Sequence, residues 1–103
     1  MTVTLMVERK VIPGAQDELS DLLRELRSKA VRQPGFISGE TVVDLFNPQI
    51  FMTISTWASV SVWEAWEKNP DRLQTVRRIN ALLSGDPVVR LWTSGPGGPP
   101  AAI

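Results

Sequence analysis

The sequence predicts an α+β fold with a split β-α-β arrangement and a four-stranded antiparallel sheet. Two observations indicate this class. The spacing of apolar residues changes along the chain in the order strand, helix, strand, strand, helix, strand, with the second helical region divided at Asn69-Pro70. Asn47-Pro48 marks a hairpin turn between the two middle strands. This order is the ferredoxin-like one, in which helices cover one face of the sheet.

The first strand is expected over residues 2–12, where Val3, Leu5 and Val7 alternate with other side chains. Pro13-Gly14 has the residue types of a turn and ends the strand. We therefore place Val3, Leu5 and Val7 on one face of the sheet.

The first helix is expected over residues 15–32. Apolar residues recur there at helical spacing, acidic residues occupy the first turns and basic residues the last, as the helix dipole favours. Pro34-Gly35 ends this helix. A second strand follows over residues 36–46, with Gly39 as a bulge or bend, and the third strand covers residues 49–57.

Ser59 has the residue type of a helix N-cap and begins a short helix that reaches about Asn69. Asn69 and Pro70 then cap and begin another helix, with Gly85 as its C-terminal stop. The last strand is expected over residues 88–93. One domain, residues 1–94, is predicted, followed by a Gly/Pro-rich tail, residues 95–103, that we expect to be unstructured.

Both faces of the sheet carry apolar residues. In the third strand Ile50, Met52 and Ile54 alternate with Phe51 and Trp57, so each face receives large apolar side chains. An antiparallel sheet with one face in water normally has a polar outer face. We therefore predict a homodimer packed sheet to sheet.

Composition excludes several kinds of function. The chain has 103 residues, no cysteine, no histidine and no tyrosine, and 11 basic against 11 acidic residues. The chain therefore lacks the residues for catalysis by a thiolate or a histidine, for Cys/His metal sites and for the usual axial ligation of haem. The zero net charge gives no indication of nucleic-acid binding, and no apolar run is long enough to span a membrane. With no signal-peptide pattern at residues 1–10, we expect a cytoplasmic protein without a metal or cofactor.

The segment TWASVSVWEAWEKNP, residues 56–70, holds three of the 4 tryptophans. On a helix from Ser59, Trp63 and Trp66 share a face, and Trp57 ends the preceding strand. They belong either to a packed core or to the wall of a pocket for a flat aromatic ligand. We assign Trp57 and Trp63 to the core and Trp66 to the pocket wall.

With PGFISGE at residues 34–40 and the Asn47-Pro48 hairpin, this tryptophan segment resembles the antibiotic biosynthesis monooxygenase (ABM) family of dimeric α/β-barrel proteins. The resemblance covers residues 3–92. One branch of the family degrades haem with an Asn, a Trp and a His. The Trp position falls on Trp66, but the Asn and His positions fall near Val7 and Val76, so haem degradation is not expected here.

The other branch implies cofactor-independent monooxygenation of a small flat aromatic or phenolic molecule, with the substrate supplying the electrons. Trp66, with Trp63 or Trp57, would then wall the site. Asn80 is a candidate for a buried amide that holds a substrate oxygen. Arg9 shares the face of Val3, Leu5 and Val7 and is a candidate partner for an anionic substrate. The resemblance identifies no catalytic residue.

Several alternatives remain open from the sequence. Asn80 could bond a neighbouring group, and Arg9, Arg72, Arg77 and Arg78 could be surface charges. Glu8 and Glu40 have the opposite strand parity, so no general base is evident. The protein could therefore be a non-catalytic dimeric module that binds a small hydrophobic molecule, or a dimerisation domain without a ligand. The number of polar groups that face the space between helices and sheet should distinguish these functions, because an enzyme needs several that converge.

Overall fold

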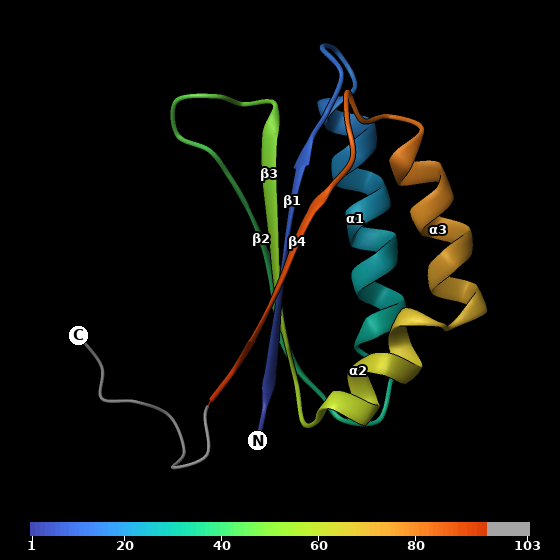
Figure 1. Cartoon of the computed structure of the whole chain (residues 1–103). Coiled ribbons are helices and arrows are strands. Elements are labelled where there is room, and N and C mark those ends of the chain that lie inside the picture. The colour runs from blue at the N-terminus through green and yellow to red at the C-terminus, as the bar shows by residue number, and fades with distance from the viewer. Residues whose placement is uncertain (95–103) are drawn as a thin grey trace.

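A computed structural model describes residues 1–94, and the expected tail, residues 95–103, lies outside the described residues (Figure 1). The elements follow the predicted order. The strands and helices are β1 (Val3–Lys10), α1 (Gln16–Ala30), β2 (Phe36–Val43), β3 (Ile50–Trp57), α2 (Val60–Glu67), α3 (Pro70–Asn80) and β4 (Val88–Thr93).

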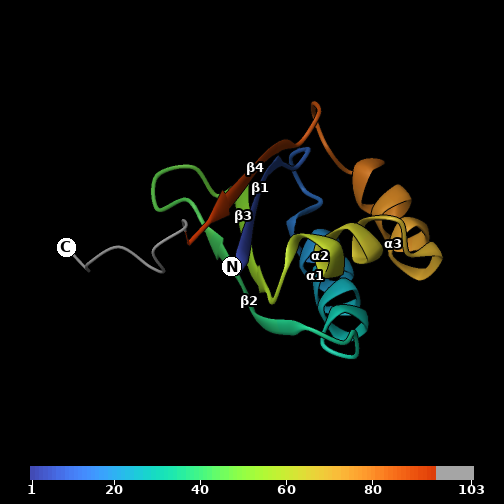
Figure 2. The ribbon, with the colours of Figure 1, turned by 60° about the horizontal axis from the view of Figure 1, so that its bottom comes forward.

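The strands form one four-stranded sheet in the order β2-β3-β1-β4, with every neighbouring pair antiparallel. The three helices lie on one side of this sheet (Figure 2). The predicted ferredoxin-like class is thus confirmed. We call the helix-covered side the inner face and the opposite side the outer face.

The inner face holds the core. One cluster joins leucines of α1 to Val11, Phe51 and Ile79, and a second joins Ala30 to Trp57 and Trp66. Val3, Leu5 and Val7 are buried on this face, as their alternation predicted. The second cluster lies at the α2 end of the molecule and provides the apolar part of the candidate site.

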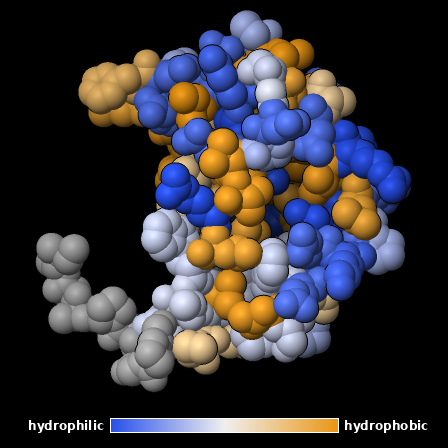
Figure 3. Space-filling model, in the orientation of Figure 1, coloured by the Kyte–Doolittle hydropathy of each residue, from blue (hydrophilic) through white to orange (hydrophobic). Residues whose placement is uncertain are grey.

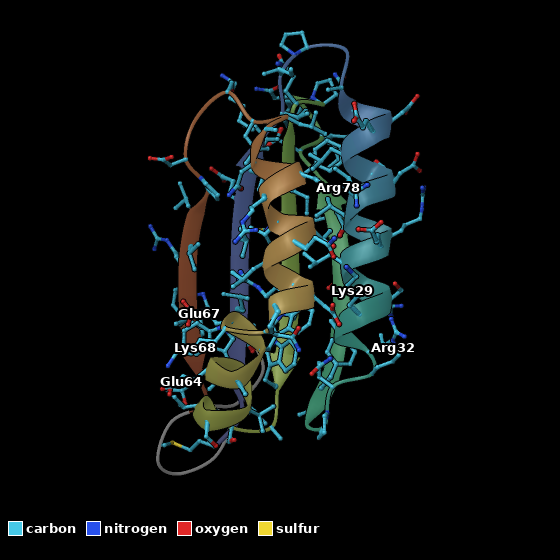
Figure 4. The ribbon with its side chains drawn as sticks, turned by 90° about the vertical axis from the view of Figure 1, so that its right-hand side faces the viewer. Lys29, Arg32, Glu64, Glu67, Lys68 and Arg78 are labelled. Atoms are coloured by element: carbon cyan, nitrogen blue, oxygen red, sulfur yellow. The ribbon has the colours of Figure 1, made fainter. Side chains whose placement is uncertain are left out.

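Helices α1 and α3 are joined across their surface by polar contacts of Glu25. Its carboxylate accepts hydrogen bonds from Thr75 Oγ1 at 2.8 Å and from Arg78 Nη1 at 2.9 Å. Lys29 Nζ donates to Thr75 Oγ1 at 2.8 Å. Figure 4 shows Lys29 and Arg78 on these two neighbouring helices. These contacts fix α3 beside α1 and therefore hold the residues of α3 over the sheet.

Gly35, in the turn before β2, meets two requirements that only glycine satisfies. Its φ is +85°, in the region that other residues rarely adopt. A Cβ built there would also lie 2.6 Å from Cγ1 of Val62. The Pro34-Gly35 turn therefore allows α2 to approach the start of β2 closely.

The predicted bulge at Gly39 is wrong. The register shift in β2 lies between Phe36 and Ser38, and Gly39 pairs regularly with Ser55. A Cβ on Gly39 would lie 3.2 Å from the ring of Phe36. The glycine is thus explained by a close aromatic neighbour within a regular strand.

The predicted end of the last helix at Gly85 is also wrong, because α3 ends at Asn80. The chain beyond it pairs with the end of β1. Leu83 forms a bridge with Val11, and the N–H of Ser84 donates to the carbonyl of Lys10 at 2.9 Å. These long-range hydrogen bonds satisfy backbone groups that a longer helix would have satisfied internally.

No helix within residues 1–94 covers the outer face, which exposes apolar side chains. Val42, Val88 and Trp92 are exposed there, and Met52 and Ile54 are half-buried between them. In Figure 3 hydrophobic surface gathers in a band over the middle of the view and again at the tip of the β2–β3 loop. Among residues 1–94, no helix is long and apolar enough to cross a membrane.

Candidate functional site

A cavity of about 70 Å³ lies between the inner face of the sheet and the helices. Strands β1, β2 and β3 form its floor and helix α1 one side. Trp66 of α2 and Arg72 of α3 complete the wall. The lining is mainly apolar, and its polar residues are Arg9, Arg27, Glu40, Thr41, Thr53, Ser55 and Arg72. A space of this composition suits an apolar molecule that carries a few polar groups.

The apolar wall consists of two stacked indoles. The rings of Trp57 and Trp66 have centroids 5.6 Å apart and planes 25° apart. Phe36 meets Trp57 edge-on at 5.3 Å and 76°. The indole N–H of Trp57 donates to Ser55 Oγ at 3.0 Å. Trp57 therefore has its polar group satisfied inside the protein, and the pair presents a rigid aromatic surface.

Arg9 brings a charge into this apolar region. Its side chain extends from β1 to the inner face, and the residue is only 4% exposed. Nη1 donates to Thr53 Oγ1 at 2.9 Å, and Thr53 Oγ1 donates to the carbonyl of Val7 at 3.3 Å. Nε is buried without a hydrogen-bond partner among residues 1–94. Burial, and then the nearby charge of Arg72, lower the pKa of the Arg9 guanidinium to about 10.

A second cavity, of about 110 Å³, lies on the same side of the sheet toward β4. Trp63, Glu67 and Asn80 line it, and four residues line both cavities. These shared residues are Leu5, Val7, Arg9 and Arg72. The two arginines are thus the polar groups common to both spaces.

Arg72 lines both cavities, and the sequence interpretation missed it, since it was assigned to the surface. It is half-buried, and its Nη1 donates to the carbonyl of Glu67 at 3.0 Å. Burial lowers the pKa of the Arg72 guanidinium, and the charge of Glu67 opposes this. A signal was present in the spacing, because Arg72 and Val76 lie four residues apart on α3 and face the same cavity.

The structure divides the five candidate residues between the two cavities. Trp66, Trp57 and Arg9 line the first, whereas Trp63, Asn80 and Arg9 line the second. Asn80 is exposed at the end of α3, so the expected burial of its amide is wrong. The helix ends at this residue, and Ile79, not Asn80, turns into the core. Trp63 is half-buried and is thus less enclosed than a core residue.

The carboxylates lie at the margins of these spaces. Glu40 lines the first cavity and Glu67 the second, and both residues are exposed. Glu64, Glu67 and Lys68 lie together on α2 and at its end, toward solvent (Figure 4). Among residues 1–94, no group of three or more acidic side chains could hold a metal ion.

The fold and these cavities define a class, the small ferredoxin-like domains with a ligand-sized space between sheet and helices. Residues 2–78 match the model of the family described as Antibiotic biosynthesis monooxygenase. The chain therefore belongs to the ABM family, as its tryptophan segment predicted.

Three relatives illustrate the relationship. The chain is 31% identical over 77 residues to the 42.8 kDa protein in the whiE locus of Streptomyces coelicolor, covering 75% of this chain and 19% of that one. It thus spans about a fifth of that relative's length. SnoaB, a cofactor-independent oxygenase from Streptomyces nogalater, is 21% identical, with a TM-score of 0.82 over 89% of this chain and 91% of SnoaB. The crystal structure of an antibiotic biosynthesis monooxygenase is 24% identical, with a TM-score of 0.83 over 91% and 99% of the two chains. At these identities the two structures show a shared fold.

Proposed function

We propose that this protein is a cofactor-independent monooxygenase that acts on a small, flat, electron-rich aromatic molecule. The observation that carries the proposal is the cavity walled by the stacked pair Trp57–Trp66, with the buried charge of Arg9 in the same lining. Membership of the ABM family and the likeness in fold to a cofactor-independent oxygenase support it.

The size of the cavities limits the substrate. A cavity of about 150 Å³ can hold benzene, whereas the two spaces that Arg9 lines measure about 70 and 110 Å³. Because these two share four lining residues, a ligand of one or two rings that occupies both is the size we expect. A third space, of about 320 Å³, borders the first cavity at Leu23, Arg27, Glu40 and Thr41 and lies away from Arg9. Trp66 would stack on its ring, and Trp63 would close the second space.

The proposed reaction balances without a cofactor. The aromatic substrate gives up two hydrogens and gains one oxygen atom of O2, and the other oxygen atom leaves as water. A phenol thereby becomes a quinone. The substrate first loses a proton and then supplies the electrons, so the protein must bind its anion and exclude bulk water. Arg9 would stabilise that negative charge, and the proton would pass to water at the cavity margin.

The test is oxygen uptake with 1-naphthol and 1,5-dihydroxynaphthalene, combined with fluorescence titration. We expect saturable quenching and uptake of O2 in the wild type, and a loss of both in Trp66→Phe. Trp92→Phe is the matched control, because it removes an indole from the outer face. Product analysis in ¹⁸O2 should place one labelled oxygen atom in the quinone. A wild type that consumes no O2 with any of these compounds would contradict the oxygenase.

A binding module is the second candidate function. It is favoured by the hydroxyls of the first cavity, because Thr53 bonds Arg9 and the Val7 carbonyl while Ser55 accepts from Trp57. Such groups are already engaged and do not serve as acids or bases. Saturable quenching that depends on Trp66, without O2 uptake, would identify this function.

We also propose that the protein is a homodimer through the outer face, since Val42, Val88 and Trp92 are exposed there. Met52 lies at the centre of this face, opposite Val42 and Glu8 in the register. We expect Met52→Glu to sediment as a monomer where the wild type sediments as a dimer, because a buried unpaired charge is costly. Val60→Glu, on the exposed side of α2, is the control. A monomeric wild type at high concentration would contradict the dimer.

A further inference from the structure

The guanidinium of Arg9 is buried with its hydrogen bonding incomplete. The residue is 4% exposed, and Thr53 accepts a bond from Nη1, yet Nε has no partner among residues 1–94. A buried charged group that lacks a partner loses the hydrogen bond it made with water. Such a group is expected where a ligand completes its bonding.

Arg72 places a second positive charge at the same position. It lines both cavities with Arg9, and the two charges are close enough for Arg72 to lower the pKa of Arg9. The ion pairs within residues 1–94 are Asp21–Arg24, Glu25–Lys29 and Glu25–Arg78. None of them includes Arg9 or Arg72. Two cations therefore share a partly buried space. Neither forms an ion pair within residues 1–94, although the charge of Glu67, which lines the second cavity, acts on Arg72.

We infer that Arg9 and Arg72 form the receptor for the carboxylate of the ligand, which is therefore a small aromatic carboxylic acid. The inference rests on the proposed function only for the aromatic body of the ligand, and it assigns Arg9 to a carboxylate instead of the phenolate formed in that reaction. The carboxylate would bond the free Nε edge of Arg9, and Arg72 would add the second charge. The ring would then meet the Trp57–Trp66 wall, which lines the same cavity as Arg9.

The chemistry of the site favours a carboxylate over an ionised phenol. The Nε–H and one terminal N–H of a guanidinium are parallel, and they match the two oxygens of a carboxylate. A carboxylate is also charged at neutral pH before it binds. A phenol must first lose its proton, and the carboxylates that line the cavities, Glu40 and Glu67, are exposed at their margins.

The test compares ligands of one shape that differ in charge. Calorimetric titration of the full chain would use 2-naphthoate, 2-naphthamide and 2-naphthol at pH 7. We expect 2-naphthoate to bind roughly 10- to 100-fold more tightly than 2-naphthamide, the range of a hydrogen bond to a charged group. The affinity for 2-naphthoate should fall as salt rises, whereas that for 2-naphthamide should not.

Four variants locate the effect. Arg9→Met should remove most of the preference for 2-naphthoate over 2-naphthamide, and Arg72 should retain the rest. Arg9→Lys keeps the charge but removes the parallel N–H groups, so it should lose most of the preference. Arg72→Met should reduce the preference by a smaller factor. Arg32→Met, an exposed arginine that lines neither cavity, is the control and should bind as the wild type does.

Three results would overturn the inference. These are equal affinity for 2-naphthoate and 2-naphthamide, tighter binding of 2-naphthol than of 2-naphthoate, and an unchanged preference in both Arg9→Lys and Arg72→Met. The last result remains decisive if Arg9→Met fails to fold. Failure of the oxygenase proposal can be distinguished from failure of this inference. If the protein prefers 2-naphthoate but consumes no O2 with any phenol, the receptor stands and the oxygenase does not. If the protein consumes O2 with neutral phenols but shows no preference for 2-naphthoate, the oxygenase proposal stands and the carboxylate receptor is contradicted.

Discussion

The inner and outer faces of the sheet depart from the usual burial pattern in opposite ways. The inner face, covered by helices, encloses the guanidinium of Arg9 at 4% exposure. The outer face, which no helix of the described residues covers, exposes Val88 and Trp92. A buried charge and an exposed apolar surface each cost free energy when left alone. Departures of this kind are expected at functional sites, and residues 1–94 compensate for neither of them. We propose a ligand for the inner face and a second subunit for the outer.

The largest expected effect compares one tryptophan from each face. Trp57→Ala removes a fully buried indole that stacks on Trp66, so we expect the free energy of unfolding to fall by about 3–5 kcal/mol. Trp92→Ala, in the dilute protein, should lose less than about 1 kcal/mol, since Trp92 is half exposed. Urea unfolding followed by circular dichroism measures both.

Protein concentration sharpens this first prediction. If the outer face is a dimer interface, the loss in Trp92→Ala grows as the concentration rises, whereas the loss in Trp57→Ala stays constant. Equal losses for the two variants in the dilute protein would contradict the difference between the faces.

The next effect has the opposite sign, because Arg9→Met should stabilise the ligand-free protein. Folding lowers the pKa of Arg9 to about 10, so the charged form is less favourable in the folded than in the unfolded state. This cost is present below pH 10 and is relieved only as the pH rises through that value. Replacing the buried charge by an apolar side chain should raise the free energy of unfolding by about 1–3 kcal/mol.

Arg90→Met is the matched change on the outer face, where Arg90 is exposed opposite Met6. We expect its effect on the dilute protein to stay within about 0.5 kcal/mol. Thermal unfolding at pH 7 compares the two variants. A loss of stability in Arg9→Met would mean that Arg9 is a structural residue with its bonding complete.

A pair of glycines tests how α2 is held over the inner face. Gly35 and Gly14 have nearly equal positive φ values, 85° and 89°, but only Gly35 has a close neighbour, Val62 of α2. Gly14→Ala should cost about 1 kcal/mol from backbone strain alone. Gly35→Ala adds the displacement of Val62 and should cost about 1 kcal/mol more. The two are compared by urea unfolding. Equal costs would show that α2 moves away freely.

Local pattern predicted most of the fold, and long-range contacts account for the rest. The alternation of Val3, Leu5 and Val7 placed β1 and its inner face, and Asn69-Pro70 placed the start of α3. The end of α3 was misplaced because Leu83 pairs with Val11, a residue distant in the sequence. Local sequence carries no signal for such pairing.

The site was predicted less completely than the fold. Strand parity put Arg9 on the inner face, but it could not show that Nε lacks a partner, since this depends on how α3 lies over β1. Arg72 resembles its exposed neighbours Arg77 and Arg78 in residue type. Only its position against the cavities distinguishes it. How far these arginines are buried, and whether their N–H groups find partners, depends on neighbours that are distant in the sequence.

The smallest expected effect concerns the contact between α1 and α3, which positions Arg72 over the inner face. Hydrogen bonds from Thr75 and then Arg78 lower the pKa of Glu25. Desolvation opposes them, and the charges of Arg78 and Lys29 add smaller contributions that lower the pKa further. The folded state thus binds fewer protons at Glu25 than the unfolded state does. The resulting stability is present above the ordinary pKa of 4.5 and is lost as the pH falls through the lower folded value.

Glu25→Gln should therefore flatten the decline of stability below pH 4.5, whereas Glu18→Gln, exposed on the same helix, should keep the wild-type decline. Urea midpoints between pH 3 and 6 measure this. Because Glu25 is a surface group, added salt should shrink the difference, and an effect that survives at 1 M salt would show that the hydrogen bond to Thr75, rather than the charges, holds the two helices together.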